Sequence, residues 1–544
     1  MPQAQQYCSG NYFSWDPKLT TPPGLYTLSI ILKSVLPISF WPGKEAPRDS
    51  RPFVEKEGAD VLSKAAETIY DAGCHITELR SIGVLTLGLM FFVCWQIRRR
   101  VQPNTNSTSG DDGWWVLSEP AAVAANICMF PPLFFFSGLY YTDVLSTFIV
   151  MLAYWAHLWR VETGRLRKHN VLTGMIVYVI GVLALMMRQT NIFWVGLFIA
   201  GLEWASMSKG NGQLNVQDHW INRASSLHEQ SSQGQLHNPP LSAATPPGKP
   251  HLSSFFTKLT ESDPIIALLS LAISALTNPI LLIARLWPYI SLLITFTIFV
   301  VWNGGVVLGD KSNHVATVHA PQLLYLFAFT TFFSFPLFLP IVLKIFAGVK
   351  ARKLPSTWTI LTLAVSTMVA TAIVHCNTII HPFTLADNRH YMFYIFRYTI
   401  LRHPLIKYTL CPIYVLAGWF IFQTLAGSPQ PPPTRDTRSK SVANGNINAI
   451  KPRPSSGPST IFTLIFALTT TLSLITAPLV EPRYFIIPWV MWRLHIASYP
   501  AAQERVMTWA ERLWYIANNV ATCWVFLNKP FQWASEPGAQ RFMW

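Results

Sequence analysis

The sequence has few charged residues for its length. Asp, Glu, Lys and Arg make up only 12% of the 544 residues, about half the share that soluble globular proteins carry. Hydrophobic residues account for 51%, the mean hydropathy is +0.30, and Phe, Trp and Tyr together reach 13%. A soluble core cannot bury this much apolar surface behind so few charges, whereas a lipid bilayer can accommodate it. The composition therefore excludes a set of soluble domains and predicts a polytopic membrane protein.

Cysteine is scarce as well. The seven cysteines are odd in number, and most of them lie within or beside apolar segments. Their spacing matches neither a disulfide framework nor a zinc site. We expect no metal site and no cofactor.

The net charge of +15 is carried by short basic clusters at the ends of apolar segments. A nucleic-acid-binding protein gathers its basic residues on one surface, whereas a multispanning protein keeps Lys and Arg at the cytoplasmic ends of its spans. The arrangement favours orientation in a membrane over binding to nucleic acid. The clusters are Arg98–Arg100, Arg165 with Arg167 and Lys168, and Lys350 with Arg352 and Lys353.

Twelve apolar segments approach the roughly 20 residues that cross a bilayer as a helix. They predict an all-α polytopic membrane protein with about a dozen transmembrane helices. The assignment is weakest near residues 264–284 and 484–496. The segments are Ile82–Ile97, Ala121–Leu139, Val144–Trp159, Val171–Met187, Ile192–Met207, Pro288–Trp302, Pro321–Phe346, Trp358–Cys376, Tyr408–Ala426, Ile461–Leu479, Tyr484–Ile496 and Leu513–Leu527.

Two long polar segments separate the apolar ones. Residues 208–262 are rich in Ser, Gln, Asn and Pro, and residues 427–459 in Pro and basic residues, so we expect both to be disordered cytosolic loops. The other expected units are a first loop at 1–80 on the non-cytosolic side with a polar insertion at 43–78, transmembrane bundles at 81–207 and 263–426, and C-terminal transmembrane segments with a tail at 460–544.

The basic clusters also predict which polar turns lie together. Alternation from the cytosolic clusters places these turns on the opposite side of the membrane, although strict alternation fails once, around residues 264–303. Ionisable groups at membrane depth are costly and usually face a cavity or a pathway. The turns are those around Asp16, Tyr140–Asp143, Arg188–Asn191, Asn303–His314, Ala386–Tyr391 and Glu481–Tyr484.

Several of these residues have a simpler structural explanation when each is taken alone. Asp16 can start a turn, Asp143 can cap the helix that follows it, and Arg188 can anchor a span at the membrane interface. The Gly309-Asp310 pair belongs to an ordinary turn pattern. The consecutive polar groups of Asp387–Tyr391 have no structural use in a span, and their concentration with the others on one face favours a functional site.

Short motifs follow one another in a fixed order along nearly the whole chain. They are Pro2–Cys8, Trp15–Pro17, Thr20–Tyr26, Tyr140–Asp143, Arg188–Asn191, Asn303–Gly305 with Gly309-Asp310, His319–Leu323, Leu385–Tyr391, Glu481–Phe485, Asn528–Trp533 and Gln540–Trp544. In content and order they resemble the dolichyl-phosphoglucose-dependent α-1,2-glucosyltransferases of the endoplasmic reticulum.

This resemblance implies a GT-C-like multispanning glycosyltransferase of the endoplasmic reticulum membrane, with its active face in the lumen. Members of the family transfer glucose from dolichyl phosphate glucose, in α-1,2 linkage, to the diglucosylated oligosaccharide on dolichyl diphosphate. That transfer is the final step in assembling the precursor for protein N-glycosylation. The implied partners are the lipid donor, the lipid-linked acceptor and the bilayer, without nucleic acid.

The implied reaction requires a base and cationic groups. An inverting transfer needs a carboxylate to deprotonate the attacking hydroxyl, and Asp16 and Asp143 are the catalytic candidates. The leaving phosphate is best stabilised by cations, and an Arg matches phosphate oxygens with two parallel hydrogen bonds. The candidates for binding donor phosphate or substrate are Arg188, Gln189, Asp310, Asp387, Arg389, His390, Glu481 and Arg483.

The family pattern begins further upstream than this chain. Members carry a membrane span, an acidic pair and a His directly before the stretch that matches Pro2–Gln5, and the base of this fold usually comes from an acidic residue in that loop. We therefore expect a longer natural protein. We also expect the chain that starts at Met1 to be essentially inactive.

Two other functions are compatible with the sequence. A transporter or channel also lines its pathway with ionisable groups, but we find no internal repeat of the kind common in transporters, and the polar residues gather at one membrane face. A non-catalytic relative would keep the fold and lack the base. Transfer of labelled glucose separates the enzyme from both.

Overall fold

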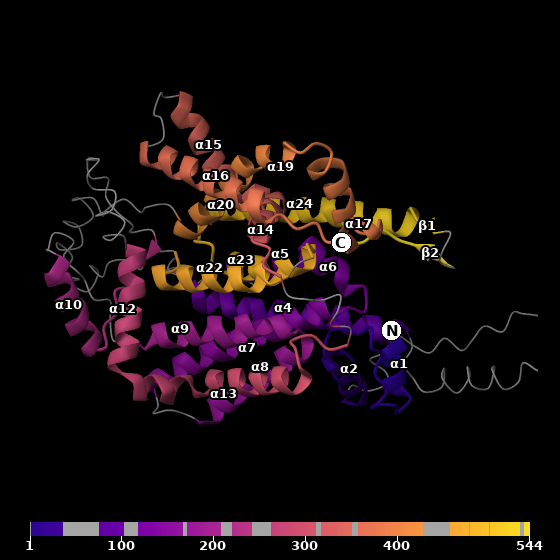
Figure 1. Cartoon of the computed structure of the whole chain (residues 1–544), viewed down its shortest axis with the longest axis horizontal. Helices are drawn as coiled ribbons and strands as arrows, with labels where there is room; N and C mark the ends of the chain where they lie inside the picture. Colours follow the sequence, from indigo (N-terminus) through magenta and orange to yellow (C-terminus); the bar gives the residue numbers. More distant parts are fainter. Residues whose placement is uncertain are drawn as a thin grey trace, which may run out of the picture.

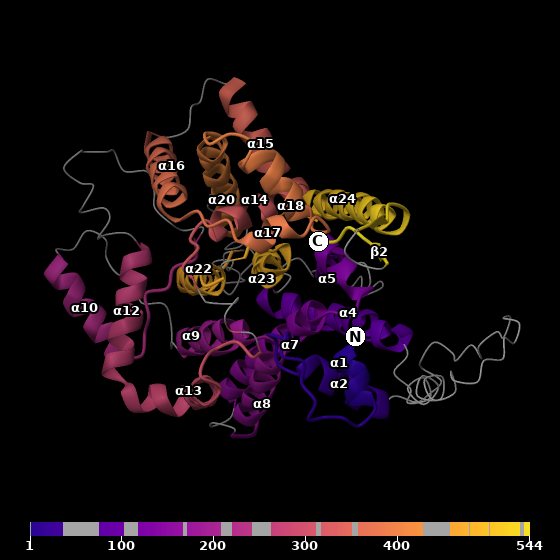
Figure 2. The ribbon, with the colours of Figure 1, turned by 45° about the vertical axis from the view of Figure 1, so that its right-hand side comes forward.

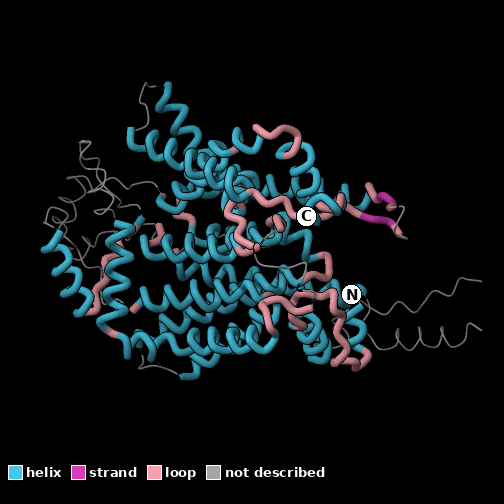
Figure 3. The backbone as a smooth tube through the Cα atoms, in the orientation of Figure 1, coloured by secondary structure: helices cyan, strands magenta, loops and turns pink. Residues whose placement is uncertain are grey.

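The computed structural model describes residues 2–35, 76–102, 118–166, 171–207, 220–241, 263–309, 311, 317–350, 357–427, 457–477, 479–499, 501–533 and 538–544. Within these residues the secondary structure consists of helices and one two-stranded antiparallel ribbon (Figures 1 and 3). The all-α prediction is confirmed.

The elements follow the chain in two groups. The first group is α1 (Pro2–Cys8), α2 (Gly24–Val35), α4 (Ile76–Val101), α5 (Glu119–Met129), α6 (Pro131–Ser137), α7 (Thr142–Leu166), α8 (Val171–Met187), η3 (Gln189–Asn191), η4 (Phe193–Phe198), α9 (Ile199–Ser206), α10 (Trp220–Ser232), α12 (Asp263–Thr277) and α13 (Pro279–Asn303). The second group is α14 (Gln322–Phe333), α15 (Phe335–Lys350), α16 (Thr357–Asn377), α17 (Pro382–Ala386), α18 (Tyr391–Ile395), η7 (Phe396–Ile400), α19 (Ile406–Thr409), α20 (Cys411–Ala426), α22 (Thr460–Ile475), η9 (Pro482–Phe485), α23 (Ile486–His495), α24 (Ala501–Asn528), β1 (Phe531–Gln532) and β2 (Ala539–Gln540).

All twelve predicted apolar segments form helices, but not all of these have the length of a span. Among the described residues, five helices are long and apolar enough to cross a membrane, and up to seven if each of two bent pairs counts as one span. Three shorter apolar helices accompany them: α8, α12 (from Pro264) and α22. The expectation of about a dozen spans therefore stays a prediction.

Two segments predicted as single spans are bent at prolines. Ala121–Leu139 divides into α5 and α6, which meet at 65°, and Pro131 and Pro132 open the second helix. Pro321–Phe346 divides into α14 and α15 at 88°, and Pro336 lies in the first turn of α15. Proline lacks the amide hydrogen that a continuing helix needs, so each break follows from the local sequence.

The segment near 484–496 forms a buried helix instead of a lipid-facing one. Every residue of α23 from Pro488 to His495 is buried. The Trp489 ring stacks on the Phe130 ring with 3.7 Å between the ring centres. A helix that is apolar all round belongs in a core, and α23 occupies the centre of the bundle.

At one end of the bundle, buried ion pairs join different helices. Arg98 of α4 contacts Glu119 of α5 at 2.6 Å, Arg493 of α23 contacts Glu511 of α24 at 2.8 Å, and Arg160 of α7 contacts Glu203 of α9 at 3.3 Å. All three arginines are buried. The Arg98 cluster was expected only to orient the chain; the structure gives Arg98 a packing role as well.

The prediction that residues 208–262 are disordered is wrong for residues 220–241. They contain α10 and a strap that packs on α12 and α22, with Leu227 and Leu236 buried. Backbone hydrogen bonds join Thr460 to the Pro239 carbonyl and Leu241 to the Pro458 carbonyl. Two apolar anchors and these paired backbone groups stabilise a segment whose composition is otherwise polar. Residues 208–219, 242–262 and 428–456, and the insertion up to residue 75, lie outside the described residues.

The first loop packs tightly against the bundle at the end opposite to α10 (Figure 1). Gly24 approaches α8 so closely that a Cβ would lie 2.3 Å from the Met186 carbonyl oxygen. Gly309, at φ +68°, would place a Cβ 2.3 Å from the Pro17 carbonyl oxygen. Only glycine fits such contacts. Cys8 at the end of α1 is disulfide-bonded, which the cysteine spacing did not predict.

Candidate active site

The structure brings Asp143 and Arg188 together. Asp143 lies in the first turn of α7, and Arg188 follows α8 directly. The Arg188 Nη2 atom donates to Asp143 Oδ1 at 2.7 Å, and the Asp143 side chain is only 2% exposed. A buried carboxylate needs a partner of opposite charge. The Asp143–Arg188 pair therefore fixes the start of α7 relative to the end of α8.

Glu481, Arg483 and Tyr484 lie beside this pair. Arg483 donates to both carboxylate oxygens of Glu481. The guanidinium groups of Arg188 and Arg483 each lie 5.8 Å from the centre of the Tyr484 ring. Burial acts to raise the pKa of Glu481, but the neighbouring Arg483 outweighs it and the net pKa is lowered. Glu481 therefore stays ionised and Arg483 stays paired at neutral pH.

A third arginine is fixed in the loop between α17 and α18. The Nε and Nη2 atoms of Arg389 donate to the Asp387 carboxylate at 2.7–3.0 Å. His390 Nε2 lies 3.7 Å from the same carboxylate. Burial acts to raise the pKa of Asp387, but its hydrogen bonds from Arg389 lower it overall. The Arg389 side chain remains 32% exposed, so a ligand can reach it.

Tyr141 lies in the electrostatic field of charges from each of the three arginine–carboxylate pairs. Burial raises the pKa of its hydroxyl. Charges from three separate segments also act on it, namely Arg483, Asp143, Glu481 and Arg389. The site is thus one region with three arginines, each bound by a carboxylate of its own. Its groups come from the start of α7, the residue after α8, the loop after α17 and the turn that leads into α23.

Gln189 joins this site to the first loop. Its side-chain amide donates to the Thr20 carbonyl at 3.1 Å. Asp16 lies in the same loop, exposed to solvent, and its Oδ1 accepts the Lys18 amide at 2.9 Å. None of the ion pairs among the described residues includes Asp16. The turn that the sequence allowed for Asp16 is present.

The predicted residues therefore divide into three sets. Those that meet in the site are Asp143, Arg188, Asp387, Arg389, His390, Glu481 and Arg483. Gln189 and Asp16 lie in the adjoining loop contact, and Asp310 falls outside the described residues. No three His, Cys, Asp or Glu side chains within the described ranges come together as metal ligands.

Sequence reasoning missed three residues of the site. Tyr484 lies near two of the arginines, and Trp533 and Gln540 contact Arg389 from the tail. All three belong to motifs of the sequence, but no role was assigned to them. The available signal was the unusual density of polar and aromatic residues in a tail that follows the last apolar segment.

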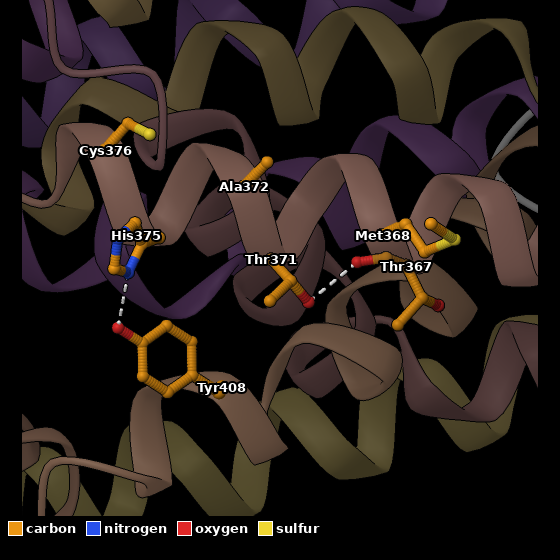
Figure 4. A pocket seen from close by; sticks show the side chains of 7 residues that line it. All are labelled: Thr367, Met368, Thr371, Ala372, His375, Cys376 and Tyr408. Atoms are coloured by element: carbon orange, nitrogen blue, oxygen red, sulfur yellow. Dashed lines mark hydrogen bonds between the residues drawn. The ribbon is translucent and has the colours of Figure 1, made fainter.

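A separate groove of about 480 Å³ lies beside α16 (Figure 4). His375 Nδ1 and the Tyr408 hydroxyl are 3.0 Å apart at one end of it. The rest of its lining is almost wholly apolar. The lining residues are Thr367, Met368, Thr371, Ala372, His375, Cys376 and Tyr408.

Comparison with known proteins gives a consistent result. The family model described as DIE2/ALG10 family matches residues 1–494. A Gibberella zeae protein is 35% identical over 686 aligned residues, which cover 100% of this chain and 88% of the relative. The rat and human proteins are 30% and 31% identical, each with 100% of this chain and 91% of the relative covered. All three relatives are named Dol-P-Glc:Glc(2)Man(9)GlcNAc(2)-PP-Dol alpha-1,2-glucosyltransferase. No solved structure matches the chain significantly.

Proposed function

The chain belongs to the DIE2/ALG10 family, and from this membership we infer that it transfers glucose from Dol-P-Glc to Glc(2)Man(9)GlcNAc(2)-PP-Dol in alpha-1,2 linkage. The observation that carries this inference is the agreement between a family match over residues 1–494 and relatives from fungi and mammals that are all named for this one reaction. The protein is thus an enzyme, a multispanning dolichol-dependent glucosyltransferase.

The three arginines are the groups that bind the donor phosphate. When the glucosyl bond breaks, the phosphodiester of the donor becomes a phosphomonoester and gains negative charge. Arg389 and Arg483 are partly exposed, at 32% and 29% of the side chain, and each is oriented by a carboxylate two residues earlier in the chain. Guanidinium groups held in place in this way stabilise developing charge without reorganising during the reaction.

The accessible carboxylate Asp16 is the better of the two candidates for the base. Asp143 is buried and already bound by Arg188, so its role is to orient that arginine. Asp16 is exposed, in the loop whose Thr20 carbonyl accepts a hydrogen bond from Gln189, so an acceptor hydroxyl can reach it. Replacing Asp16 with Asn is expected to slow transfer at least a hundredfold with an unchanged donor KM, because general bases contribute about 10²–10⁴ in rate. Transfer within threefold of the wild-type rate would exclude this role.

The isoprenoid chain of the donor lies in the groove beside α16. The groove is apolar and belongs to a helix of membrane-spanning length, of which only 11% is buried inside the protein. His375 and Tyr408 supply the polar groups at one end, 3.0 Å apart. An apolar groove on the exposed side of such a helix suits a lipid chain.

The site faces the lumen of the endoplasmic reticulum. The basic clusters support this orientation, as does the disulfide at Cys8 in the first loop, because disulfides persist in oxidising compartments. A glycosylation reporter placed between Asp387 and Tyr391 should be modified in microsomes, and one placed within residues 208–219 should not. The reverse pattern would place the site in the cytosol.

The function is tested by complementation. In a strain that lacks this glucosyltransferase, expression of the protein should restore the third glucose on the lipid-linked oligosaccharide, scored by chromatography of the released glycan. That result would overturn the expectation, drawn from the family resemblance, that the chain starting at Met1 is essentially inactive, and it would make Asp16 or Asp143 the base. A transporter or a non-catalytic relative would leave the glycan with two glucose residues.

A further inference from the structure

The tail of the chain returns from α24 to the loop that carries Arg389. In both ribbon views the C-terminus lies beside α17 (Figures 1 and 2). Met543 forms a parallel bridge with His390. Its amide donates to the Arg389 carbonyl at 2.8 Å, and its carbonyl accepts the Tyr391 amide at 3.2 Å. The tail therefore pairs with the backbone of Arg389 and of Tyr391, on the two sides of His390.

The tail also contacts the Arg389 side chain directly. The Nη1 atom of Arg389 donates to Gln540 Oε1 at 2.9 Å, and the guanidinium carbon lies 4.7 Å from the centre of the Trp533 ring. Trp533 in turn donates through Nε1 to Asn388 Oδ1 at 2.9 Å. With Asp387 bound to Nε and Nη2, the guanidinium is thus contacted at two edges and on one face.

The tail is itself attached to the helical bundle. The Trp544 ring packs on Phe333 of α14 and on Tyr391, with 5.4 and 4.9 Å between ring centres. Arg541 donates through Nη1 to the carbonyls of Phe526 and Leu527 near the end of α24, at 2.6 and 3.0 Å. Through these contacts the tail fixes the position of Arg389 relative to the helical bundle.

We propose that Trp533 and Gln540 are positioning residues that orient the Arg389 guanidinium for binding the donor phosphate. The proposal rests on the function inferred above. An unrestrained arginine loses conformational entropy when it binds a ligand, because several side-chain torsions become fixed. Ordering these torsions beforehand lowers the entropic cost of binding. Asp387 alone does not fix the guanidinium, because its hydrogen bonds reach Nε and Nη2 and leave the Nη1 edge and the planar face to other contacts.

A neutral amide at position 540 has a chemical reason. Asp387 already supplies one negative charge next to Arg389. A second carboxylate would give the group a net negative charge and repel a phosphate, whereas the Gln540 oxygen accepts a hydrogen bond without adding charge. A neutral side chain at position 540 is therefore expected where Arg389 binds an anion, whereas a role in stability alone would also allow a carboxylate there.

The test uses Gln540→Glu and Gln540→Ala, with Gln532→Ala as the matched control. Gln532 lies in the same ribbon, opposite Ala539, and its side chain is exposed. We expect Gln540→Ala to raise the donor KM about tenfold, the size of one charge-assisted hydrogen bond, and Gln540→Glu to raise it further. The acceptor KM and the Tm should stay at wild-type values, and the control variant should behave as wild type.

Three results would overturn the proposal. The first is a donor KM for Gln540→Glu equal to that of the wild type. The second is an equal rise of the donor and acceptor KM, and the third is a fall in Tm that accounts for the lost activity. Conservative Trp533→Phe, which retains a ring face for Arg389, should keep the donor KM within threefold of wild type, while Trp533→Ala should raise it about fivefold. If wild-type protein transfers no glucose, the proposed function fails instead, so the two failures are separable.

Discussion

Arginine–carboxylate pairs occur at both ends of the bundle, but they are built differently. At the α10 end, Arg98, Arg160 and Arg493 pair with carboxylates on other helices, and their side chains are 1–4% exposed. At the first-loop end, Arg389 and Arg483 pair with carboxylates two residues earlier, and their side chains are 32% and 29% exposed. Asp143 and Arg160 lie at the two ends of α7, 17 residues or about 25 Å apart.

The difference teaches how to separate a structural ion pair from one that serves a ligand. A pair between buried groups of different helices is part of the packing, because removing one partner leaves a buried charge. A pair between near neighbours contributes little to stability and fixes only the direction of the guanidinium. Accessibility together with a local partner therefore marks Arg389 and Arg483 as ligand-binding groups.

The largest effect is expected from breaking a buried pair. Within the described part of the chain, Arg493→Ala leaves Glu511 charged, buried and hydrogen-bonded only by the Asn126 and Tyr515 side chains, which should lower the free energy of unfolding by about 3–5 kcal/mol. Thermal unfolding of the purified protein measures this. The double variant Arg493→Met with Glu511→Leu should recover part of the loss, and a double variant less stable than the single one would contradict this account.

At the opposite end, Arg389→Ala should slow glucose transfer at least tenfold. It removes a charge-assisted contact to the donor phosphate of about 1.5–3 kcal/mol. The Tm should change little, because the exposed pair with Asp387 adds only about 0–1 kcal/mol to stability. The check is the transfer rate of the purified variant next to its melting curve. Near-normal transfer, or a loss of activity explained by unfolding, would remove Arg389 from the site.

Asp143→Asn sharpens the comparison, since its pair with Arg188 is buried like those of the α10 end yet lies in the site. The amide keeps the shape and loses the charge, so Arg188 should be less well oriented. We expect the donor KM to rise about fivefold, equivalent to ~1 kcal/mol, with kcat little changed. A loss of a hundredfold or more in kcat would instead make Asp143 the base.

The smallest effect concerns the groove. Thr371→Trp should fill it and raise the KM for the dolichyl donor about threefold, by excluding part of an apolar chain. A donor with only two isoprene units should be unaffected. Val369→Trp, on the exposed part of the same helix, is the matched control. If the donor with the short chain is affected equally, the groove does not hold the lipid.

The sequence predicted much of the fold because the relevant information is local. Each of the twelve predicted hydrophobic segments forms helix, and the limits of α8 agree with the predicted Val171–Met187. Both bends follow from prolines that the span assignments overlooked. The strap at residues 220–241 was missed because its stability depends on Leu227 and Leu236 reaching a distant helix, which composition does not show.

The candidate site likewise has one part that is visible in the local sequence and another that depends on long-range packing. Asp387 with Arg389 and Glu481 with Arg483 are near neighbours, so their grouping was visible in the sequence. Tyr484 between Arg188 and Arg483, and Gln540 on Arg389, depend on contacts between residues up to 296 positions and 151 positions apart respectively in the chain. Such contacts come from packing of the whole bundle, and no local pattern encodes them.

The most direct test of the account is transfer by the purified protein from Dol-P-[14C]Glc to lipid-linked oligosaccharides of defined glucose number. We predict incorporation of a single α-1,2-linked glucose into the diglucosylated acceptor, little into the monoglucosylated one, and a reduction of at least tenfold for Arg389→Ala. Absence of transfer by folded wild-type protein supplied with both substrates, or equal use of both acceptors, would contradict it.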